Sequence, residues 1–313
     1  MAHAADGRHQ VMFAATAPIP AWEPQPDVWL LIGLLAAGYW IACVRLGPRL
    51  APNPQRVVTR LQVVSYSLGV FATWVAADWP VHETGEQSLF AVHMVQHFTF
   101  AMVAVPFLLM GTPAWLARWL LTPRWLLHTL RQCARFVPAI LIFNAVLLLT
   151  HWPWFVTQAL SNGLVHFAAH SLLFISSIIV WLPVVSPLPE IPRFVPPVRL
   201  LYLFSQSVLP TIPASFLTLG SGPLYRWYLG TPRVFGVSVL DDQRAAGLIM
   251  KSVAGLILWG VMAVVFFRWG AAEERRQNRV RQGARSRSAA EARSTMLFSE
   301  LDGSVVTDPG VHR

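Results

Sequence analysis

The sequence has few charged residues and few cysteines, and these shortages disfavour several protein classes. Only 12% of its 313 residues are charged, whereas soluble domains carry about 25%, which argues against a soluble globular enzyme. The two cysteines, Cys43 and Cys133, are far apart and form no CxxC motif, which disfavours a disulfide scaffold and a thiolate metal site. A Gly-rich phosphate loop and the GxSxG and HExxH motifs are also missing, so the sequence does not indicate an enzyme.

What is present is apolar: 55% of the residues are hydrophobic, the mean hydropathy is +0.49 and 14 residues are Trp. Trp favours membrane–water interfaces, and a bilayer core is crossed by about 20 mostly apolar helical residues. We therefore predict an all-α, polytopic membrane bundle. Its seven predicted transmembrane helices cover approximately residues 28–46, 62–78, 89–110, 136–152, 163–183, 199–219 and 244–268.

Three parts follow from this pattern: an exposed N-terminal tail (1–27), a membrane domain (28–270) and an Arg-rich tail (271–313) that we expect to be disordered. Residues 113–133 are less apolar and carry three arginines, so we interpret them as an interfacial helix or loop. The stretch LPTIP (209–213) predicts a kink or a short unwound segment in the sixth span.

Basic residues determine the predicted orientation. They gather after the first, third, fifth and seventh spans, whereas residues 79–88 and 153–162 contain none; only 220–243, with Arg226 and Arg233, departs from the pattern. The positive-inside rule then places the N-terminus outside and the C-terminus in the cytoplasm. Because this rule accounts for most of the net charge of +9, we do not expect a nucleic-acid partner.

Ionisable groups within a membrane are costly and usually functional, and here they gather at one end of the spans. Histidines four residues apart share a helical face, with side chains about 6 Å apart. All of these groups fall in the outer part of the predicted membrane. The candidate metal ligands are His93, His97, His151, His166 and His170, with Asp78, Asp241, Asp242 and Gln243 as supporting groups or additional ligands.

Neutral imidazole binds copper, zinc and iron, so we expect a metal or haem at this cluster. Pairs of histidines suit a metal ion better than haem, which usually takes one histidine from each of two helices. We expect Met94 to point to another face than His93, and Met94 and Met102 to pack against lipid or helices. Lys251, the only lysine, lies deep in the seventh span. It indicates either a structural pair, for example with Asp78, or an ion path.

Several of these strings resemble the CtaG-type cytochrome c oxidase assembly factors, which are polytopic bacterial membrane proteins. The resemblance covers about 89–270 and is most specific in HMVQH (93–97) and DDQRAAGLIM (241–250). It also includes THWPWFVTQAL (150–160), HFAAHSLLFISSIIVWLPVVSP (166–187) and LYLFSQSVLPTIPASFLTLGSGPLYRWY (201–228). Members often have an acidic residue between the two histidines of the fifth span, where this chain has Ala169.

The resemblance implies an assembly factor in the bacterial inner membrane that handles copper for the metal centres of an oxidase. Its partners would be the oxidase subunits and the lipid bilayer, and the sequence is compatible with a homo-oligomer. Two alternatives stay open. One is a haem-binding redox protein, and the other is an ion or metal transporter whose path includes Lys251, Asp241 and Asp242.

Overall fold

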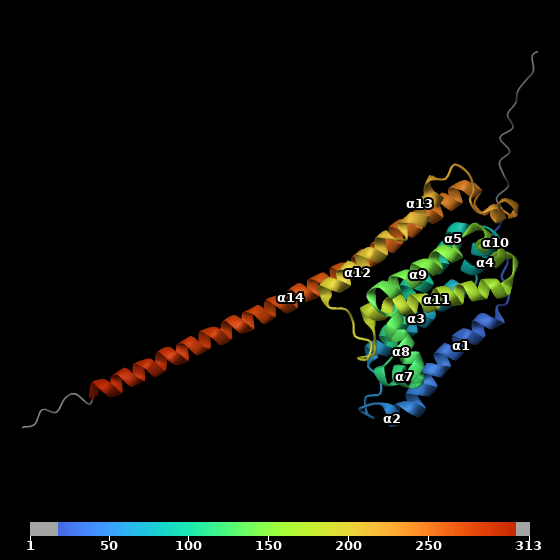
Figure 1. The fold of residues 1–313 in the computed structure, drawn as a ribbon. Coiled ribbons are helices and arrows are strands. Elements are labelled where there is room, and N and C mark those ends of the chain that lie inside the picture. Colours follow the sequence, from blue (N-terminus) through green and yellow to red (C-terminus); the bar gives the residue numbers. More distant parts are fainter. Residues whose placement is uncertain (1–17, 305–313) are drawn as a thin grey trace, which may run out of the picture. The chain divides into compact units, whose positions relative to one another are not determined.

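The computed structural model describes residues 18–304, with side chains described to residue 294. Helices joined by loops make up this described part, and none of it forms a β-strand, so the predicted all-α class is confirmed (Figure 1). Three elements are not α-helical: η1 (Ala42–Leu46) and η2 (Thr99–Ala104) are π-helical, and η3 (Arg226–Gly230) is a 3₁₀ helix.

Each predicted span contains helix, and shorter helices lie between the spans. They are α1 (Pro26–Ile41), α2 (Gly47–Leu50), α3 (Arg60–Ala77), α4 (Val81–Gln87), α5 (Phe90–Phe98), α6 (Val105–Gly111), α7 (Ala114–Leu120), α8 (Arg124–Cys133), α9 (Phe136–Thr150), α10 (Pro153–Ser161), α11 (Gly163–Val185), α12 (Pro196–Val208), α13 (Thr211–Leu219) and α14 (Val239–Ser304).

Five helical stretches of the described chain are long and apolar enough to cross a membrane. They are Pro26–Leu50, Phe90–Gly111, Gly163–Val185, Pro196–Leu219 and Val239–Ser294. A sixth arises if α8 and α9, which meet at an angle of 86°, are counted as one broken span. The predicted second span coincides with α3, of 18 residues, and the fourth with α9, of 15 residues. The number seven therefore stays a prediction, as does the orientation.

Large apolar side chains lie exposed on these helices. Examples on four of them are Phe71, Leu141, Ile175 and Leu256, which are between 55% and 73% exposed. Soluble monomers rarely present so much contiguous apolar surface. Lipid is the medium that such a surface suits, so the exposed side chains agree with a multi-pass membrane protein.

Local sequence signals explain where several helices begin and end. Thr59 and Gln62 form a capping box at the start of α3. The Asn162 side chain accepts hydrogen bonds from the backbone N–H groups of Leu164 and Val165 and so caps α11. The predicted interruption of the sixth span is present at Leu209 and Pro210, between α12 and α13. Pro210 lacks a backbone N–H and cannot continue the hydrogen-bond ladder of α12.

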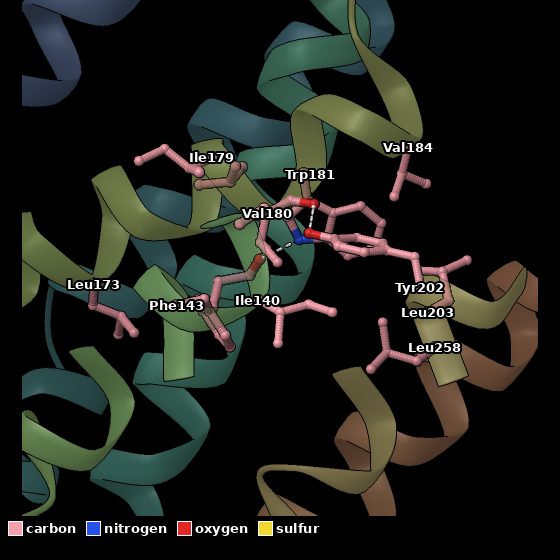
Figure 2. Packing of buried hydrophobic residues seen from close by; sticks show 13 residues of the cluster. Ile140, Phe143, Leu173, Ile179, Val180, Trp181, Val184, Tyr202, Leu203 and Leu258 are labelled. Carbon is pink, nitrogen blue, oxygen red and sulfur yellow. Dashed lines mark hydrogen bonds between the residues drawn. The ribbon is translucent and has the colours of Figure 1, made fainter. Parts of the chain in front are cut away.

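The largest apolar cluster joins η2, α6, α9, α11, α12 and α14 (Figure 2). Two buried polar contacts hold it together: the indole Nε1 of Trp181 donates to the Ala101 carbonyl at 2.8 Å, and the Tyr202 hydroxyl donates to the Val180 carbonyl at 2.9 Å. Ala101 belongs to the π-helical η2, directly after α5. This core therefore supports the helix segment that carries His93 and His97.

The chain divides into two compact units, Met1–Met262 and Ala263–Arg313. Within the second unit the structure differs from the prediction, because residues 271–304, expected to be disordered, belong to the helix α14. Their Ala, Glu, Arg and Gln residues favour helix, and the Arg276 guanidinium donates to the Glu273 carboxylate at 3.1 Å, one turn apart. The rest of the two predicted tails, 1–17 and 305–313, lies outside the described residues.

Candidate metal site

Four imidazoles from α5 and α11 meet at one place. The helical spacing of four residues sets the ring centroids of His93 and His97 4.3 Å apart, and those of His166 and His170 4.3 Å apart. Between the two helices, the Nε2 atoms of His97 and His170 are separated by 3.1 Å. His93, His97 and His170 each offer a ring nitrogen within 4.8 Å of the others. The structure thus brings together both histidine pairs singled out from the sequence.

A carboxylate from outside the two helices fixes one of these rings. The Nδ1 atom of His166 contacts Oε1 of Glu86, a residue of α4. When Glu86 is ionised, its carboxylate only accepts hydrogen bonds, so the proton of His166 then lies on Nδ1 and the Nε2 atom keeps a lone pair. Carboxylate–histidine contacts of this kind orient the metal-binding imidazoles of many proteins.

At the centre of the cluster, the ring nitrogens outnumber the protons that could form hydrogen bonds between them. Nε2 of His170 lies 2.8 Å from Nε2 of His166 and 3.1 Å from Nε2 of His97, and a neutral His170 has at most one proton to share there. The Nδ1 atoms of His93 and His97 are buried without a hydrogen-bond partner in the described chain. A central cation would take up one nitrogen lone pair from each ring, so the donor set fits a metal ion.

The distances agree with this interpretation. A tetrahedral ion with metal–nitrogen bonds of about 2.0–2.1 Å holds its ligand nitrogens about 3.3 Å apart. The two Nε2 separations around His170 are 2.8 and 3.1 Å. His93, His97 and His170 each offer a ring nitrogen within 4.8 Å of the others, so these three rings are the ones that side-chain rotations would bring around one ion.

Glu86 also joins the cluster to a second histidine. Nε2 of His82, one turn earlier in α4, lies 3.2 Å from Oε1 of Glu86, and Nδ1 of His82 lies 3.0 Å from the amide nitrogen of Gln96. Burial, with the nearby Glu83 carboxylate adding to it, raises the pKa of Glu86 to about 7. Burial also lowers the pKa of His82. A chain of polar contacts thus leads from Gln96 through His82 and Glu86 to His166.

The sequence analysis did not select Glu86, because residues 79–88 were used only as a segment without basic residues that indicates the orientation. They form the short helix α4. The spacing of His82 and Glu86 was a signal for this helix face, since residues four apart lie side by side. Ala169, which lies between the two histidines of α11, has no carboxylate, and the carboxylate that contacts His166 comes from Glu86. Ala169 itself is 5% exposed and packs in the interior.

His151 lies beside the cluster, at the C-terminal end of α9, and its ring centroid is 5.9 Å from that of His97. Its Nδ1 atom lies 2.8 Å from the Leu147 carbonyl and its Nε2 atom lies 3.3 Å from the sulfur of Met94. The expectation that Met94 packs against helices is confirmed, since its side chain is 3% exposed, and its sulfur also faces the ring of His151. Met94 follows His93 in α5, but it is three residues from His97 and so shares that flank of the helix.

Asp242 and Gln243 lie at buried junctions. The Asp242 carboxylate accepts hydrogen bonds from the backbone N–H groups of Phe90 and Ala91, both at 2.9 Å, and forms an ion pair with Arg233 at 3.0 Å. The Gln243 side chain accepts from the backbone N–H of Leu224 and donates to the carbonyl of Tyr225. Asp242 thus fixes the first turn of α5, and Gln243 fixes the loop before η3. Both support the scaffold rather than touch the imidazoles in the described chain.

The remaining predicted polar residues bind elsewhere. The Asp78 carboxylate accepts hydrogen bonds from the indoles of Trp29 and Trp74 and from the Trp79 backbone. Asp241 is exposed and pairs with Ser238 and Arg244. The Lys251 ammonium donates to the Thr218 hydroxyl at 3.0 Å, and the suggested pair with Asp78 is not among its contacts in the described chain.

The comparison with known families agrees with this arrangement. The family model of the cytochrome c oxidase caa3 assembly factor matches residues 37–272, a range that includes every histidine of the cluster and Glu86. No curated protein and no solved structure matches the chain. The match extends over three quarters of the sequence and includes the HMVQH and DDQRAAGLIM strings. The chain belongs to the family of cytochrome c oxidase caa3 assembly factors.

Proposed function

We propose that this membrane protein binds copper as cargo at the histidine cluster while it assists cytochrome c oxidase assembly. Family membership indicates an interaction with the oxidase and a non-catalytic role. The observation that carries the copper proposal is the convergence of imidazole nitrogens from α5 and α11 around His170. Copper stands near the top of the affinity order for nitrogen ligands among divalent first-row metals.

The chemistry asked of the residues is binding and release. His97, His166 and His170 would offer neutral Nε2 lone pairs, so no ligand has to lose a proton first. Glu86 would keep the proton of His166 on Nδ1 and hold the ring in its binding orientation. His93, whose Nδ1 has no partner in the described chain, would be a fourth ligand.

The proposal includes the location of the site. With seven spans and the C-terminus in the cytoplasm, α5 and α11 both enter the bacterial inner membrane from outside, and their histidines lie near that surface. The distribution of arginines supports this orientation. Copper would then be accepted and handed on at the outer face.

The two alternatives receive less support. A haem needs a pocket of several hundred Å³, in the range of about 300–1,000 Å³ for ligand pockets, whereas the cavity beside His97 and His151 measures about 60 Å³. A transport path through Lys251 would need its ammonium to exchange partners, and this ammonium already bonds Thr218. Haem binding predicts a Soret band in the purified protein, and transport predicts flux that is lost in Lys251→Met.

The test replaces His93 and His97 by Ala in a host that carries the oxidase. We expect oxidase copper content and activity to fall strongly, because two of the converging ligands are gone, while the variant still inserts into the membrane. Copper analysis of the purified oxidase measures its copper content, and immunoblots of membranes measure the insertion of the variant. His128→Ala is the matched control, since His128 belongs to α8 and lies outside the cluster. Normal oxidase copper in the double variant would refute the proposal.

A further inference from the structure

A cavity lies next to the histidine cluster and has a different chemical lining. It measures about 60 Å³, which is room for a metal ion with its ligands or a few water molecules. His97 borders both the cluster and this cavity. Besides His97, the cavity is lined by four side chains with a sulfur or nitrogen atom that could bind a metal. They come from α5, η2, the end of α9 and α14, and they are Met94, Met102, His151 and Met250.

Two of these atoms, Nε2 of His151 and the sulfur of Met94, face each other without a hydrogen between them. A carbonyl oxygen only accepts hydrogen bonds, so the 2.8 Å contact with the Leu147 carbonyl requires the proton on Nδ1 of His151. Nε2 of the neutral ring therefore carries a lone pair, and it points at the Met94 sulfur 3.3 Å away. A thioether sulfur is itself only a weak acceptor. Two acceptors in this arrangement suit a shared cation.

The distance fits such a cation. First-row metal bonds of about 2.0 Å to nitrogen and about 2.3 Å to sulfur, at a tetrahedral angle, separate the two ligand atoms by about 3.5 Å. The observed separation of 3.3 Å between Nε2 of His151 and Sδ of Met94 is close to this value. A bound ion therefore requires little movement of either side chain.

The ligand set also selects the metal. Soft thioether ligands favour Cu(I), whereas imidazole alone accepts zinc, copper and iron alike. No carboxylate lines the cavity, so nothing in its lining would balance a doubly charged ion. The surroundings are apolar, with Ala101, Phe143 and Leu173 in the wall. A singly charged Cu(I) ion is the cation that these walls and sulfurs accept best.

We propose that Met94 and His151, together with Met102 and Met250, form a Cu(I) site in the membrane interior beside the histidine cluster. This inference rests on the proposed function, because it gives the copper cargo a second binding position. The π-helical η2, which carries Met102 directly after α5, fits the idea, since π-helical turns often occur at functional sites. His97, which borders both positions, would allow an ion to pass from one to the other.

The test uses the full-length chain in detergent, loaded without oxygen with one equivalent of Cu(I). X-ray absorption at the copper edge should show sulfur neighbours at about 2.3 Å. The triple variant Met94→Leu, Met102→Leu, Met250→Leu should lose this sulfur signal and bind Cu(I) about tenfold or more weakly, an effect in the range of lost ligand-shell contacts. Leu keeps the volume of each side chain. Met110→Leu is the matched control, because Met110 is exposed on α6 and lies outside the cavity.

Zn(II) titration of the same samples separates the two proposals. The triple variant should bind Zn(II) like the wild type, which also shows that it is folded. His93→Ala/His170→Ala should lose Zn(II) binding but keep the copper–sulfur signal. Copper that has only nitrogen neighbours in the wild type, or no Cu(I) binding at all, overturns the thioether site. Zn(II) binding that is unchanged in the His93→Ala/His170→Ala variant counts instead against the histidine cluster and therefore against the proposed function.

Discussion

The chemistry of the cluster at the scale of single residues depends on which nitrogen of each imidazole carries the proton. The Leu147 carbonyl holds the proton of His151 on Nδ1, and Glu86 in its ionised form does the same for His166. Both rings therefore direct the Nε2 lone pair toward other donors, His170 in one case and Met94 in the other. A buried lone pair without a hydrogen or a cation is costly, so these two contacts decide which ring nitrogens would accept the metal under the proposed function.

Replacing Glu86 by Gln tests this arrangement. The amide oxygen accepts hydrogen bonds, but it carries no charge and does not fix the imidazole tautomer as firmly, so we expect metal affinity to fall by about 10–100-fold. Zn(II) or Cu(II) titration of the purified protein measures the change. Glu190→Gln serves as a control, since Glu190 pairs with Arg118 at a distant exposed position. An unchanged affinity in Glu86→Gln would mean that the contact with His166 has no role in binding.

Helix positions are set by a few contacts between elements that lie far apart in the sequence. The carboxylate of Asp242 at the start of α14 caps α5, which carries His93 and His97. An anion at a helix N-terminus is favoured by the helix dipole. The ion pair with Arg233 satisfies the same buried carboxylate, which is 1% exposed. The neighbouring residues Asp241 and Asp242 therefore have quite different roles.

Replacing Asp242 by Ala should destabilise the protein by about 3–5 kcal/mol, the range for breaking a buried ion pair. The loss follows because Arg233 and two backbone N–H groups of α5 would be left without their partner. Thermal unfolding in detergent measures it. Asp241→Ala, one residue earlier and exposed, should stay within about 0.5 kcal/mol. Equal stability of the two variants would show that the cap on α5 is dispensable.

The contact between α3 and α6 requires glycine. A Cβ added at Gly111 would lie 2.4 Å from the backbone nitrogen of Tyr66, closer than van der Waals contact permits, and small residues commonly allow membrane helices to approach in this way. We expect Gly111→Ala to cost about 1–3 kcal/mol through overpacking. The fraction of protein that survives heating in detergent measures this cost. Gly33→Ala on α1, where nothing lies within 4 Å, should be neutral or stabilising.

Topology is the property to test at the scale of the whole molecule. Five or six helices of the described chain satisfy the length and hydropathy criteria for spans, and α3 and α9 decide whether the number reaches seven. Both helices pack within the membrane unit, α9 against α11 and α3 against α6. A helix that packs against other spans can be less apolar on the packed side, but it must still cross the same bilayer thickness.

Reporter fusions test the orientation of the chain. A fluorescent protein that folds only in the cytoplasm should be active when fused after Arg313, and alkaline phosphatase, which folds only outside, should be active when inserted between residues 153 and 162. This pattern follows from the Arg-rich loops after the odd-numbered spans. An inactive C-terminal fluorescent fusion beside active phosphatase there would reverse the proposed orientation. It would also place the histidine cluster at the cytoplasmic face.

Sequence reasoning predicted the helical class, the two histidine pairs and the break before α13, because each depends on local periodicity or on proline. The same reasoning missed Glu86, because residues 79–88 were used only as a segment without basic residues, and it did not pair Met94 with His151. Both contacts depend on where a side chain points once helices have packed. It also predicted disorder for a tail whose residues form the helix α14 up to Ser304, since composition alone does not distinguish a solvated helix from a disordered chain.

The sequence by itself determined that this chain is a helical membrane protein, that it resembles the oxidase assembly factors and which histidines share a helix face. These properties follow from residues close together along the chain. Only the tertiary structure decided that His170 stands between His97 and His166, that Glu86 orients one of these rings, and that Asp242 braces α5 while Asp241 lies exposed. The physical reason is that each of these contacts joins separate helices, and helix packing, not sequence spacing, sets which side chains meet.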